Sequence, residues 1–265
     1  MIHSNASTGR RFGQNFLDDE MSEKIAEDLP CALQDEILEI GAGHGALTAF
    51  LLPKCAKLTA VEIDNFCIPK LQERFKGESK FNLIHKNFLQ FDFENFLTKN
   101  ENNLWVVGNL PYNMATAIIL KILPFINSSD NFKGCMFMTQ LEVAERITAN
   151  AGTSGYGSLS VFVAANANAR IIRTINPKHF TPKPKVNSAT ILLTPLEYPP
   201  LLNSVFFNFV RRAFSQKRKT LANSLSEYYE KEKVFEVLQA LTIKENVRAE
   251  QLSLQEFISI FSKLK

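Results

Sequence analysis

The sequence predicts an α/β protein in two parts: a mainly parallel sheet up to about residue 196, then a small all-helical part. Short apolar runs alternate with helical patterns from residue 36 onward, which is typical of βαβ units and a parallel sheet. Tyr198-Pro199-Pro200 marks a boundary. Beyond it the apolar residues recur at helical spacing. We therefore place the two domains at residues 1–196 and 197–265.

Seven apolar runs are predicted to form the strands of the sheet. They cover residues 36–40, 58–63, 81–84, 104–108, 135–138, 159–165 and 189–193. Helices are predicted from Leu47 onward, over 66–75 and over 115–123. In the C-terminal part, one helical stripe runs from Phe207 to Leu225, and Ser253-Leu254-Gln255-Glu256 is a capping box that opens the last helix.

Composition excludes several classes of protein. With 265 residues, 45% hydrophobic and 22% charged, the chain has ordinary globular values. No apolar run approaches a membrane span, and the first residues lack the apolar stretch of a secretory signal. The four cysteines have neither CxxC nor zinc spacing. We expect reduced thiols, no metal site and a cytoplasmic location.

A glycine-rich turn and an acidic residue predict a site for a nucleoside-containing cofactor. Glu39-Ile40-Gly41-Ala42-Gly43-His44-Gly45 follows a predicted strand and opens a helix. Glu62 ends the next strand, where a carboxylate can accept both hydroxyls of a ribose. The spacing GxGxG differs from the GxGxxG of nicotinamide dehydrogenases and suits S-adenosylmethionine. A glycine-rich turn without any cofactor is the plain alternative.

The fourth predicted strand ends in Asn109-Leu110-Pro111-Tyr112, beside the expected cofactor. The Asn109 side-chain oxygen and the Leu110 carbonyl can accept from the N–H groups of an aromatic amine and turn its lone pair out of the ring plane. Pro111 stiffens the turn, and Tyr112 can stack on a base. Catalysis by positioning would then suffice. An ordinary strand-to-helix turn is the alternative.

Several motifs resemble those of the small-subunit ribosomal RNA adenine dimethyltransferases, the KsgA family. Asn109-Leu110-Pro111-Tyr112 is similar to the motif of adenine-N6 methyltransferases that act on ribosomal RNA. The other similar segments are 11–17 (RFGQNFL), 156–160 (YGSLS), 180–188 (FTPKPKVNS) and 218–225 (RKTLANSL). The resemblance runs from about residue 10 to the end of the chain. It implies a Rossmann-like methyltransferase fold with a helical C-terminal domain.

The resemblance also implies roles for individual residues. Asn15 and Leu17 would enclose the methionine end of S-adenosylmethionine, Gly41 would contact it through the backbone, and Glu62 would hold the ribose. Asn109 would serve both cofactor and target amine. Tyr112 and Phe180 would sandwich a flipped adenine, with core packing as the alternative for Phe180. The family usually has an aspartate where this chain has Asn87, which can still accept from the cofactor adenine but carries no charge.

The net charge of +3 conceals a basic stretch. Residues 170–220 contain ten basic residues and one acidic residue, so this block carries +9. We interpret it as a phosphate-binding surface, with a solvated helix face as the alternative. The residues expected to bind RNA are Arg211, Arg212, Lys217, Arg218 and Lys219. The expected partner is a small-subunit assembly intermediate with its ribosomal RNA, bound by a monomer.

Three functions follow from this reading. The first is transfer of methyl groups from S-adenosylmethionine to the N6 amines of two adjacent adenines near the 3′ end of small-subunit ribosomal RNA. The second is adenine methylation of large-subunit RNA, which confers antibiotic resistance. The third is a non-catalytic RNA-binding or assembly factor, which the uncharged Asn87 favours and the intact Glu62 and Asn109 disfavour.

Overall fold

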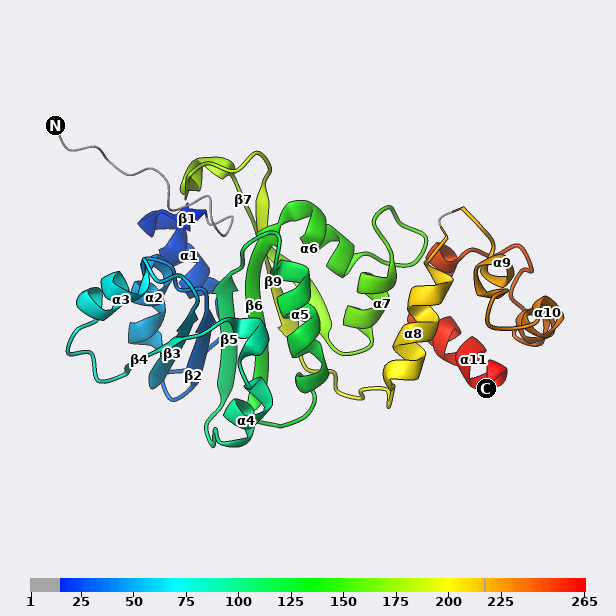
Figure 1. Cartoon of the computed structure of the whole chain (residues 1–265), viewed down its shortest axis with the longest axis horizontal. Coiled ribbons are helices and arrows are strands. Elements are labelled where there is room, and N and C mark those ends of the chain that lie inside the picture. The colour runs from blue at the N-terminus through cyan, green and yellow to red at the C-terminus, as the bar shows by residue number, and fades with distance from the viewer. Residues whose placement is uncertain (1–14, 217) are drawn as a thin grey trace. The chain divides into compact units, whose positions relative to one another are not determined.

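The computed structural model describes residues 15–216 and 218–265, and Figure 1 shows strands and helices alternating along the chain. Cα packing divides the chain into two units. The first contains residues up to Ala144 together with Asn168–Leu196. The second contains Glu145–Ala167 and Glu197–Lys265. A unit boundary therefore falls at the predicted position, but residues 145–167, which the sequence analysis placed in the first domain, pack with the C-terminal helices.

A seven-stranded sheet forms the centre of the first unit, in the order β4-β3-β2-β5-β6-β9-β7. Its strands are β2 (Glu36–Ile40), β3 (Lys57–Glu62), β4 (Phe81–His85), β5 (Leu104–Asn109), β6 (Phe132–Gln140), β7 (Asn168–Ile175) and β9 (Ser188–Thr194). The first five run parallel, while β9 lies antiparallel between β6 and β7. The predicted mainly parallel sheet is confirmed.

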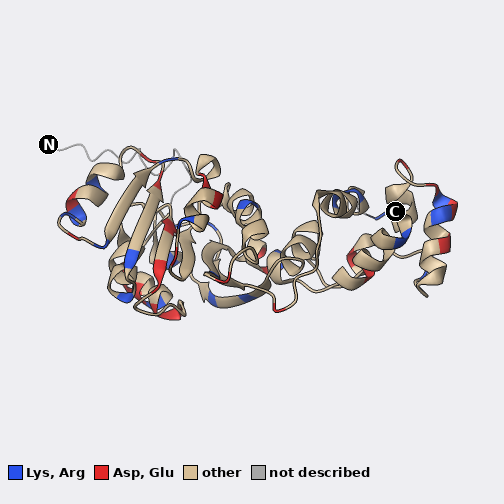
Figure 2. Cartoon of the chain, turned by 90° about the horizontal axis from the view of Figure 1, so that it is seen from below, with Lys and Arg blue, Asp and Glu red and all other residues tan. Residues whose placement is uncertain are grey.

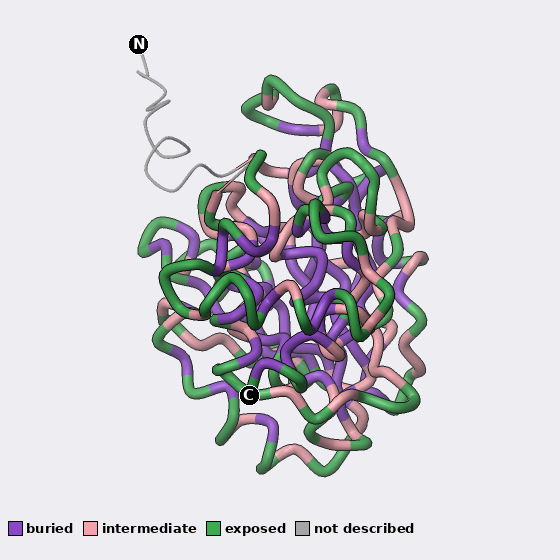
Figure 3. Tube along the Cα trace, turned by 90° about the vertical axis from the view of Figure 1, so that its right-hand side faces the viewer, coloured by how far each residue is buried: buried purple, intermediate pink, exposed green. Residues whose placement is uncertain are grey.

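Helices cover the sheet because the strands carry apolar side chains on both faces. They are α1 (Asp19–Asp28), α2 (Ala46–Leu51), α3 (Ile68–Arg74), α4 (Phe93–Thr98) and α5 (Ala115–Ile122). Helix α6 (Leu141–Thr148) begins in the first unit and continues into the second. One hydrophobic cluster joins α1, α2 and α3 to the sheet, with Ile25, Leu51 and Leu71 packed against Ile37 and Leu58. The inner strands β2, β3, β5, β6 and β9 are mostly buried, whereas the edge strands β4 and β7 are largely half-buried or exposed. Figure 3 shows the buried residues gathered in the interior and the exposed ones toward the outside.

A separate two-stranded ladder joins residues 15–18, called here the N-terminal segment, to the loop before β9. It pairs β1 (Phe16–Leu17) with β8 (Phe180–Thr181), antiparallel, so that Leu17 lies opposite Phe180. Asp18 N–H also donates to the carbonyl of His179. Two of the family-like segments that are far apart in the sequence, around residues 15 and 180, are therefore neighbours.

The expected strand over 159–165 is wrong: α7 (Ser158–Ala164) is a helix of the second unit. A short continuous apolar run does not distinguish a buried strand from a buried helix by its period. The Gly157 N–H donates to Ser160 Oγ at 3.0 Å and caps the first turn. The missing strand is β7, an edge strand whose Arg170, Arg173 and Thr174 interrupt the apolar pattern.

The C-terminal helices of the second unit are α8 (Ser204–Ala213), α9 (Leu221–Leu225), α10 (Lys231–Ala240) and α11 (Leu254–Leu264). The single helix expected from Phe207 to Leu225 is therefore wrong. The chain turns after Phe214, and Arg218 adopts a left-handed φ of 73° before Thr220 caps α9. Phe214 continues the stripe because it packs against Phe257. The predicted capping box of Ser253 and Glu256 is confirmed at the start of α11.

The cysteines in the described part of the chain are free thiols, and Cys55, Cys67 and Cys135 are buried. Burial raises the pKa of Cys55 and of Cys67 to about 12. Within residues 15–216 and 218–265, no cluster of three or more His, Cys, Asp or Glu residues is arranged to hold a metal ion. No helix in the same residues is long and apolar enough to cross a membrane.

Candidate active site

A cavity opens at the carboxyl ends of the parallel strands β2, β3 and β5, where open α/β sheets bind their ligands. Its walls come from the loops after these strands and after β4, from the N-terminal half of α5 and from residues 15–17 at β1. The six residues expected to bind the cofactor all line it: Asn15, Leu17, Gly41, Glu62, Asn87 and Asn109. The sequence analysis therefore selected residues that the fold brings together.

Glu62 connects the two loops that form one side of the cavity. It is 1% exposed, and its Oε2 accepts from Gly43 N–H at 2.8 Å. Its Oε1 accepts from the N–H groups of Ile63 and Asp64, each at 2.8 Å. Gly43 has a left-handed φ of 58°, which glycine adopts without strain. A carboxylate offers about four acceptor positions, so roughly one remains for a ligand hydroxyl.

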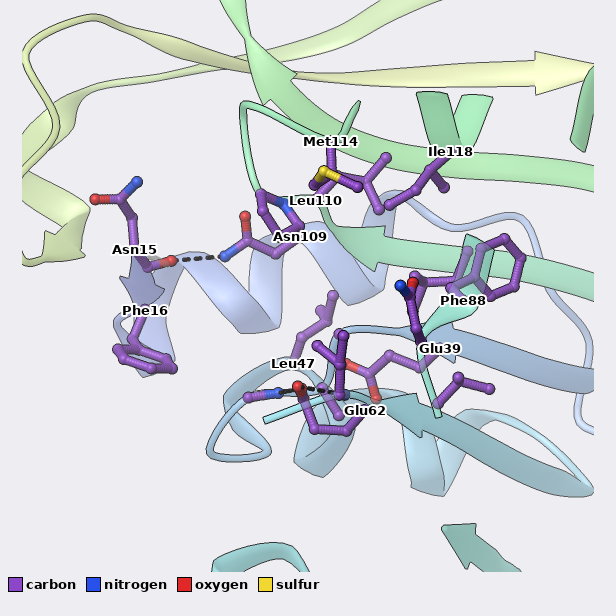
Figure 4. A pocket seen from close by; sticks show the side chains of 18 of the residues that line it. Asn15, Phe16, Glu39, Leu47, Glu62, Phe88, Asn109, Leu110, Met114 and Ile118 are labelled. Carbon is purple, nitrogen blue, oxygen red and sulfur yellow. Dashed lines mark hydrogen bonds between the residues drawn. The ribbon is translucent and has the colours of Figure 1, made fainter. Parts of the chain in front are cut away.

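Asn109 is held by the N-terminal segment. Its Nδ2 donates to the Asn15 carbonyl at 2.8 Å, the contact that is dashed in Figure 4. Because the amide nitrogen is engaged, the orientation of the side-chain oxygen is set. Leu110 is 1% exposed, and its N–H donates to the Met138 carbonyl on the neighbouring strand β6. Two hydrogen bonds to other segments therefore fix the first half of the tetrad.

Tyr112 and Phe180 lie outside the set of described residues that line the cavity. Tyr112 is half-buried, and its hydroxyl lies 2.6 Å from Ser188 Oγ, the first residue of β9. The pKa of Tyr112 is raised above its ordinary value, because the effect of burial exceeds the opposing effect of the hydrogen bond to Ser188. Phe180 is 4% exposed and belongs to the hydrophobic cluster. The structure thus gives Phe180 a packing role, which the sequence analysis held as its alternative.

Asn87 is partly engaged by its own loop. Its Oδ1 accepts from Leu89 N–H at 3.0 Å and caps the 3₁₀ turn Phe88–Gln90. The other polar atom of this side chain is an N–H₂ group, which only donates. Phe88, the next residue, lines the cavity and is 5% exposed. The polar and apolar groups that could flank an adenine therefore follow one another in the chain.

Glu39 is the residue that the sequence analysis noted only as an acidic residue before the glycine turn. It lines the cavity, is 1% exposed, and its Oε2 accepts from Thr48 Oγ1 at 2.6 Å. The pKa of Glu39 is raised to about 7. Burial is the main cause, the charge of Glu62 adds to it, and the hydrogen bond from Thr48 opposes it. The cavity is therefore lined by two buried carboxyl groups, one of which is easily protonated.

The sequence did not indicate which apolar residues line the cavity. Met114 and Ile118 reach it from α5 (Figure 4), and Ile63 follows Glu62. Their place depends on which strands are neighbours, a property that one sequence does not display. The apolar spacing of the helix that begins at Ala115 indicates only that one of its faces is buried.

The residues expected to bind RNA belong to the second unit. The Arg212 guanidinium lies 3.6 Å from the Tyr228 ring centroid, and that of Arg211 lies 5.2 Å from the Phe162 ring. Arg218 and Lys219 are exposed in the turn between α8 and α9. Lys217 lies outside the described residues. These aromatic contacts orient the two arginines.

The rest of the basic block lies in the first unit, and Figure 2 shows lysine and arginine residues spread along the chain. In the first unit, Arg173 makes a bidentate ion pair with Asp28 of α1: Nε donates to Oδ2 at 2.7 Å and Nη2 to Oδ1 at 2.8 Å. Arg173 therefore joins β7 to α1, and it is not part of a free basic surface. The basic residues of the +9 block are thus divided between the two units, and one of them, Arg173, is neutralised by its ion pair with Asp28.

Comparisons with known proteins agree on one family. The family model described as "Ribosomal RNA adenine dimethylase" matches residues 5–265. A protein of Clostridium botulinum (strain Kyoto / Type A2), named "Ribosomal RNA small subunit methyltransferase A", is 41% identical over 253 residues, which are 94% of this chain and 90% of the relative. A protein of the same name from Pseudomonas fluorescens (strain Pf0-1) is 39% identical over 259 residues, 96% of this chain and 92% of the relative.

Solved structures are similar over the same length. A dimethyladenosine transferase from Plasmodium falciparum has a TM-score of 0.80 and 25% identity, covering 94% of this chain and 97% of that one. The 23S rRNA methyltransferase ErmE has a TM-score of 0.69 and 22% identity, covering 94% of this chain and 99% of that one. The second likeness shows the fold alone.

Replacing Glu39 with glutamine is expected to remove a pH dependence of stability. The folded-state pKa of about 7 lies above the ordinary value, so the carboxyl group stabilises the fold in its protonated form. This contribution is complete below the unfolded pKa of about 4.5 and is lost as the pH rises through about 7. It amounts to at most about 3 kcal/mol.

Urea unfolding at about pH 5 and about pH 8 measures this effect. We expect wild type and Glu39→Gln to be similar at the lower pH, and the variant to be the more stable at the higher pH. Glu73→Gln, at an exposed position of α3, is the matched control. Parallel pH profiles of wild type and Glu39→Gln would contradict the assignment.

Proposed function

This chain belongs to the ribosomal RNA adenine dimethylase family, and from that premise we propose that it methylates small-subunit ribosomal RNA. The substrate would be the N6 amines of two adjacent adenines in a hairpin near the 3′ end. The observation that carries the proposal is the single cavity lined by the six expected cofactor residues, with Asn109 and Leu110 in its wall.

The cavity residues fit S-adenosylmethionine by their chemistry. Glu62 offers a remaining acceptor position to the ribose, and Phe88 and Ile118 offer apolar walls to the adenine. Asn15, Leu17 and Gly41 would enclose the methionine end. Glu39 supplies a carboxyl group that a cationic ligand would favour in its ionised form. When bound, the cofactor supplies an electrophilic methyl group on a sulfonium.

Asn109 and Leu110 would activate the target amine by geometry. The Asn109 Oδ1 and the Leu110 carbonyl accept the two N–H groups, and the nitrogen lone pair then points out of the ring plane toward the methyl carbon. The cofactor, held by the residues that line the cavity, would supply the methyl group, and sulfur would keep the electron pair of the carbon–sulfur bond as the new nitrogen–carbon bond forms. The amine proton then leaves to solvent, so no strong base is required. The bond from Asn109 to Asn15 keeps the acceptor oriented.

Tyr112 and Phe180 would form the two walls around the flipped adenine. The bond from Tyr112 to Ser188 supports this role for Tyr112, since it anchors the ring without occupying its face. Phe180 also packs in the hydrophobic cluster and is 4% exposed, so little of its ring is free to contact a base. Tyr112 is therefore the principal stacking residue of the proposal.

The second unit would hold the RNA. Arg211, Arg212, Lys217, Arg218 and Lys219 are proposed to contact phosphates, and residues 197–265 to form the RNA-binding domain. We further propose that the chain acts as a monomer, in the cytoplasm, on an assembly intermediate of the small subunit. Its relatives are named for the small subunit, which favours this reading over large-subunit methylation.

Nucleoside mass spectrometry tests the proposal directly. Small-subunit particles lacking the modification are incubated with the protein and S-adenosylmethionine, and large-subunit particles are treated in parallel. Dimethyladenosine in the small-subunit RNA alone is expected. Product in the large-subunit RNA would favour the resistance activity, and cofactor binding without any product would favour a non-catalytic assembly factor.

Asn109→Ala is expected to lower methyl transfer by about 100-fold or more, because the variant loses an acceptor that positions the amine. Single-turnover transfer to small-subunit particles measures the loss. Asn82→Ala, at an exposed position at the start of β4, removes the same side chain at the opposite edge of the sheet and serves as the control. Transfer by Asn109→Ala at the wild-type rate would refute the assigned role.

Asn87→Asp is expected to tighten S-adenosylmethionine binding by about 10-fold. One carboxylate oxygen can cap Leu89 N–H, as Asn87 Oδ1 does now, while the second accepts from the cofactor adenine. Calorimetric titration gives the Kd. The control is Asn82→Asp, which introduces the same charge at an exposed position of β4. A Kd that does not decrease would show that Asn87 is not placed against the adenine.

Removing two charges from the turn after α8 is expected to make RNA binding less dependent on salt. For Arg218→Ala/Lys219→Ala, the slope of log Kd against log salt should decrease by roughly 2, with one counterion fewer for each lost phosphate contact. The control is Lys244→Ala/Lys263→Ala, which removes two exposed lysines of the same unit. Equal slopes for the two double variants would contradict the proposed surface.

A further inference from the structure

The N-terminal segment is joined to the glycine-rich turn by one ring stack. The rings of Phe16 and His44 lie parallel, with centroids 4.1 Å apart and an interplanar angle of 10°. The Phe16 ring also packs directly on Gly43, where a Cβ atom would lie 3.0 Å from its Cε1. Asn15, Phe16, Leu17 and His44 all line the cavity. The stack therefore closes one wall of the site.

Helix α3 holds His44 from the other side. Lys70 Nζ lies 3.1 Å from His44 Nε2, and Arg74 Nη1 donates to the His44 carbonyl at 2.9 Å. An ammonium group has no acceptor, so Nε2 must accept the hydrogen bond and the imidazole is neutral. Burial and the charge of Lys70 lower the pKa of His44, and Asp64 raises it. The neutral ring is thus the form that this contact requires.

We propose that His44 is a positioning residue that fastens Phe16 over the bound cofactor, and that protonation of its imidazole releases the segment. This inference rests on the proposed function, because the ligand whose affinity it controls is S-adenosylmethionine. A protonated Nε2 no longer accepts from Lys70, and the imidazolium lies beside two cations. The ring then turns or moves away from Lys70, and the stack with Phe16 is lost.

Other groups near the segment set the direction of the pH effect. Lys70 and Arg74 face His44 from α3, and Asp64 faces it from the loop after β3. At the far end of the segment, His179 Nδ1 lies 2.9 Å from Asp18 Oδ2. Glu39 and Glu62 share the cavity. The contribution of His44 must therefore be measured as a difference between variants.

Calorimetric titration with S-adenosylmethionine at about pH 8 and about pH 5 provides that difference. At the higher pH, His44→Ala should raise the Kd about 2- to 10-fold, the range that a stacked ring pair contributes, and His44→Phe should restore it. Wild type should lose more affinity at the lower pH than His44→Phe does. The inference fails if wild type and His44→Phe lose affinity equally, or if His44→Ala binds as wild type does.

Lys70→Met tests whether the hydrogen bond from Lys70 to His44 matters, apart from the packing of the His44 ring on Phe16. This variant lacks both the hydrogen bond that protonation of His44 breaks and the cation that repels the imidazolium, so its affinity should fall less between about pH 8 and about pH 5 than that of wild type. Lys76→Met removes an exposed lysine near the end of α3 and should leave the profile unchanged. Identical profiles for the two lysine variants would overturn the proposed role of His44 protonation. Thermal unfolding of each variant checks that it folds.

Amide hydrogen exchange in residues 15–18 gives a readout that does not depend on the cofactor. After correction for intrinsic rates, exchange should be faster at about pH 5 than at about pH 8 in wild type and show a smaller change in His44→Phe. Absence of S-adenosylmethionine binding by wild type would refute the proposed function. Exchange that is equally pH-dependent in both proteins would refute the fastening.

Discussion

The buried carboxylate of Glu62 is the constraint on which the site depends. A buried charge is costly unless it is fully hydrogen-bonded, and here three backbone N–H groups satisfy it, from Gly43, Ile63 and Asp64. These donors belong to two different loops. They converge only because β2 and β3 are parallel neighbours whose carboxyl ends meet at one edge of the sheet. The same bonds that satisfy the charge therefore shape the cavity, and they leave little acceptor capacity unused.

A second constraint links the cofactor side of the cavity to the target side. The hydrogen bond from Asn109 to the Asn15 carbonyl joins the end of β5 to the N-terminal segment, and the β1–β8 ladder joins that segment to the loop around Phe180. Movement of the segment would thus change both the proposed wall around the cofactor and the orientation of Asn109, the proposed amine acceptor. Cofactor closure and substrate positioning share the same few backbone contacts, which gives the two binding events a physical route for coupling.

Much of the site could be predicted from the sequence because its residues sit where strands end. Gly41, Glu62 and Asn109 each follow a recognisable apolar run, and parallel strands bring such ends together. Glu39 and Ile118 could not be assigned in this way, since their place depends on the strand order and on helix packing. Residues 159–165 form a helix and not a strand, because their continuous apolar run has no distinguishing period. Phe180 shows a further limit: a residue in a functional motif can also be a core residue, and only burial reveals it.

Asn87 and His44 lie on two different loops that line one cavity. Asn87 Oδ1 already accepts from Leu89 N–H, so one lone pair of this uncharged oxygen remains for a ligand N–H. His44, in the turn after β2, adds a ring stack with Phe16 and a hydrogen bond from Lys70. Contributions from independent contacts add, so a weakened contact in one loop can be offset by a stronger closure over another. The proposed fastening of Phe16 depends on a neutral His44 imidazole, so it would make the affinity for the cofactor a function of pH.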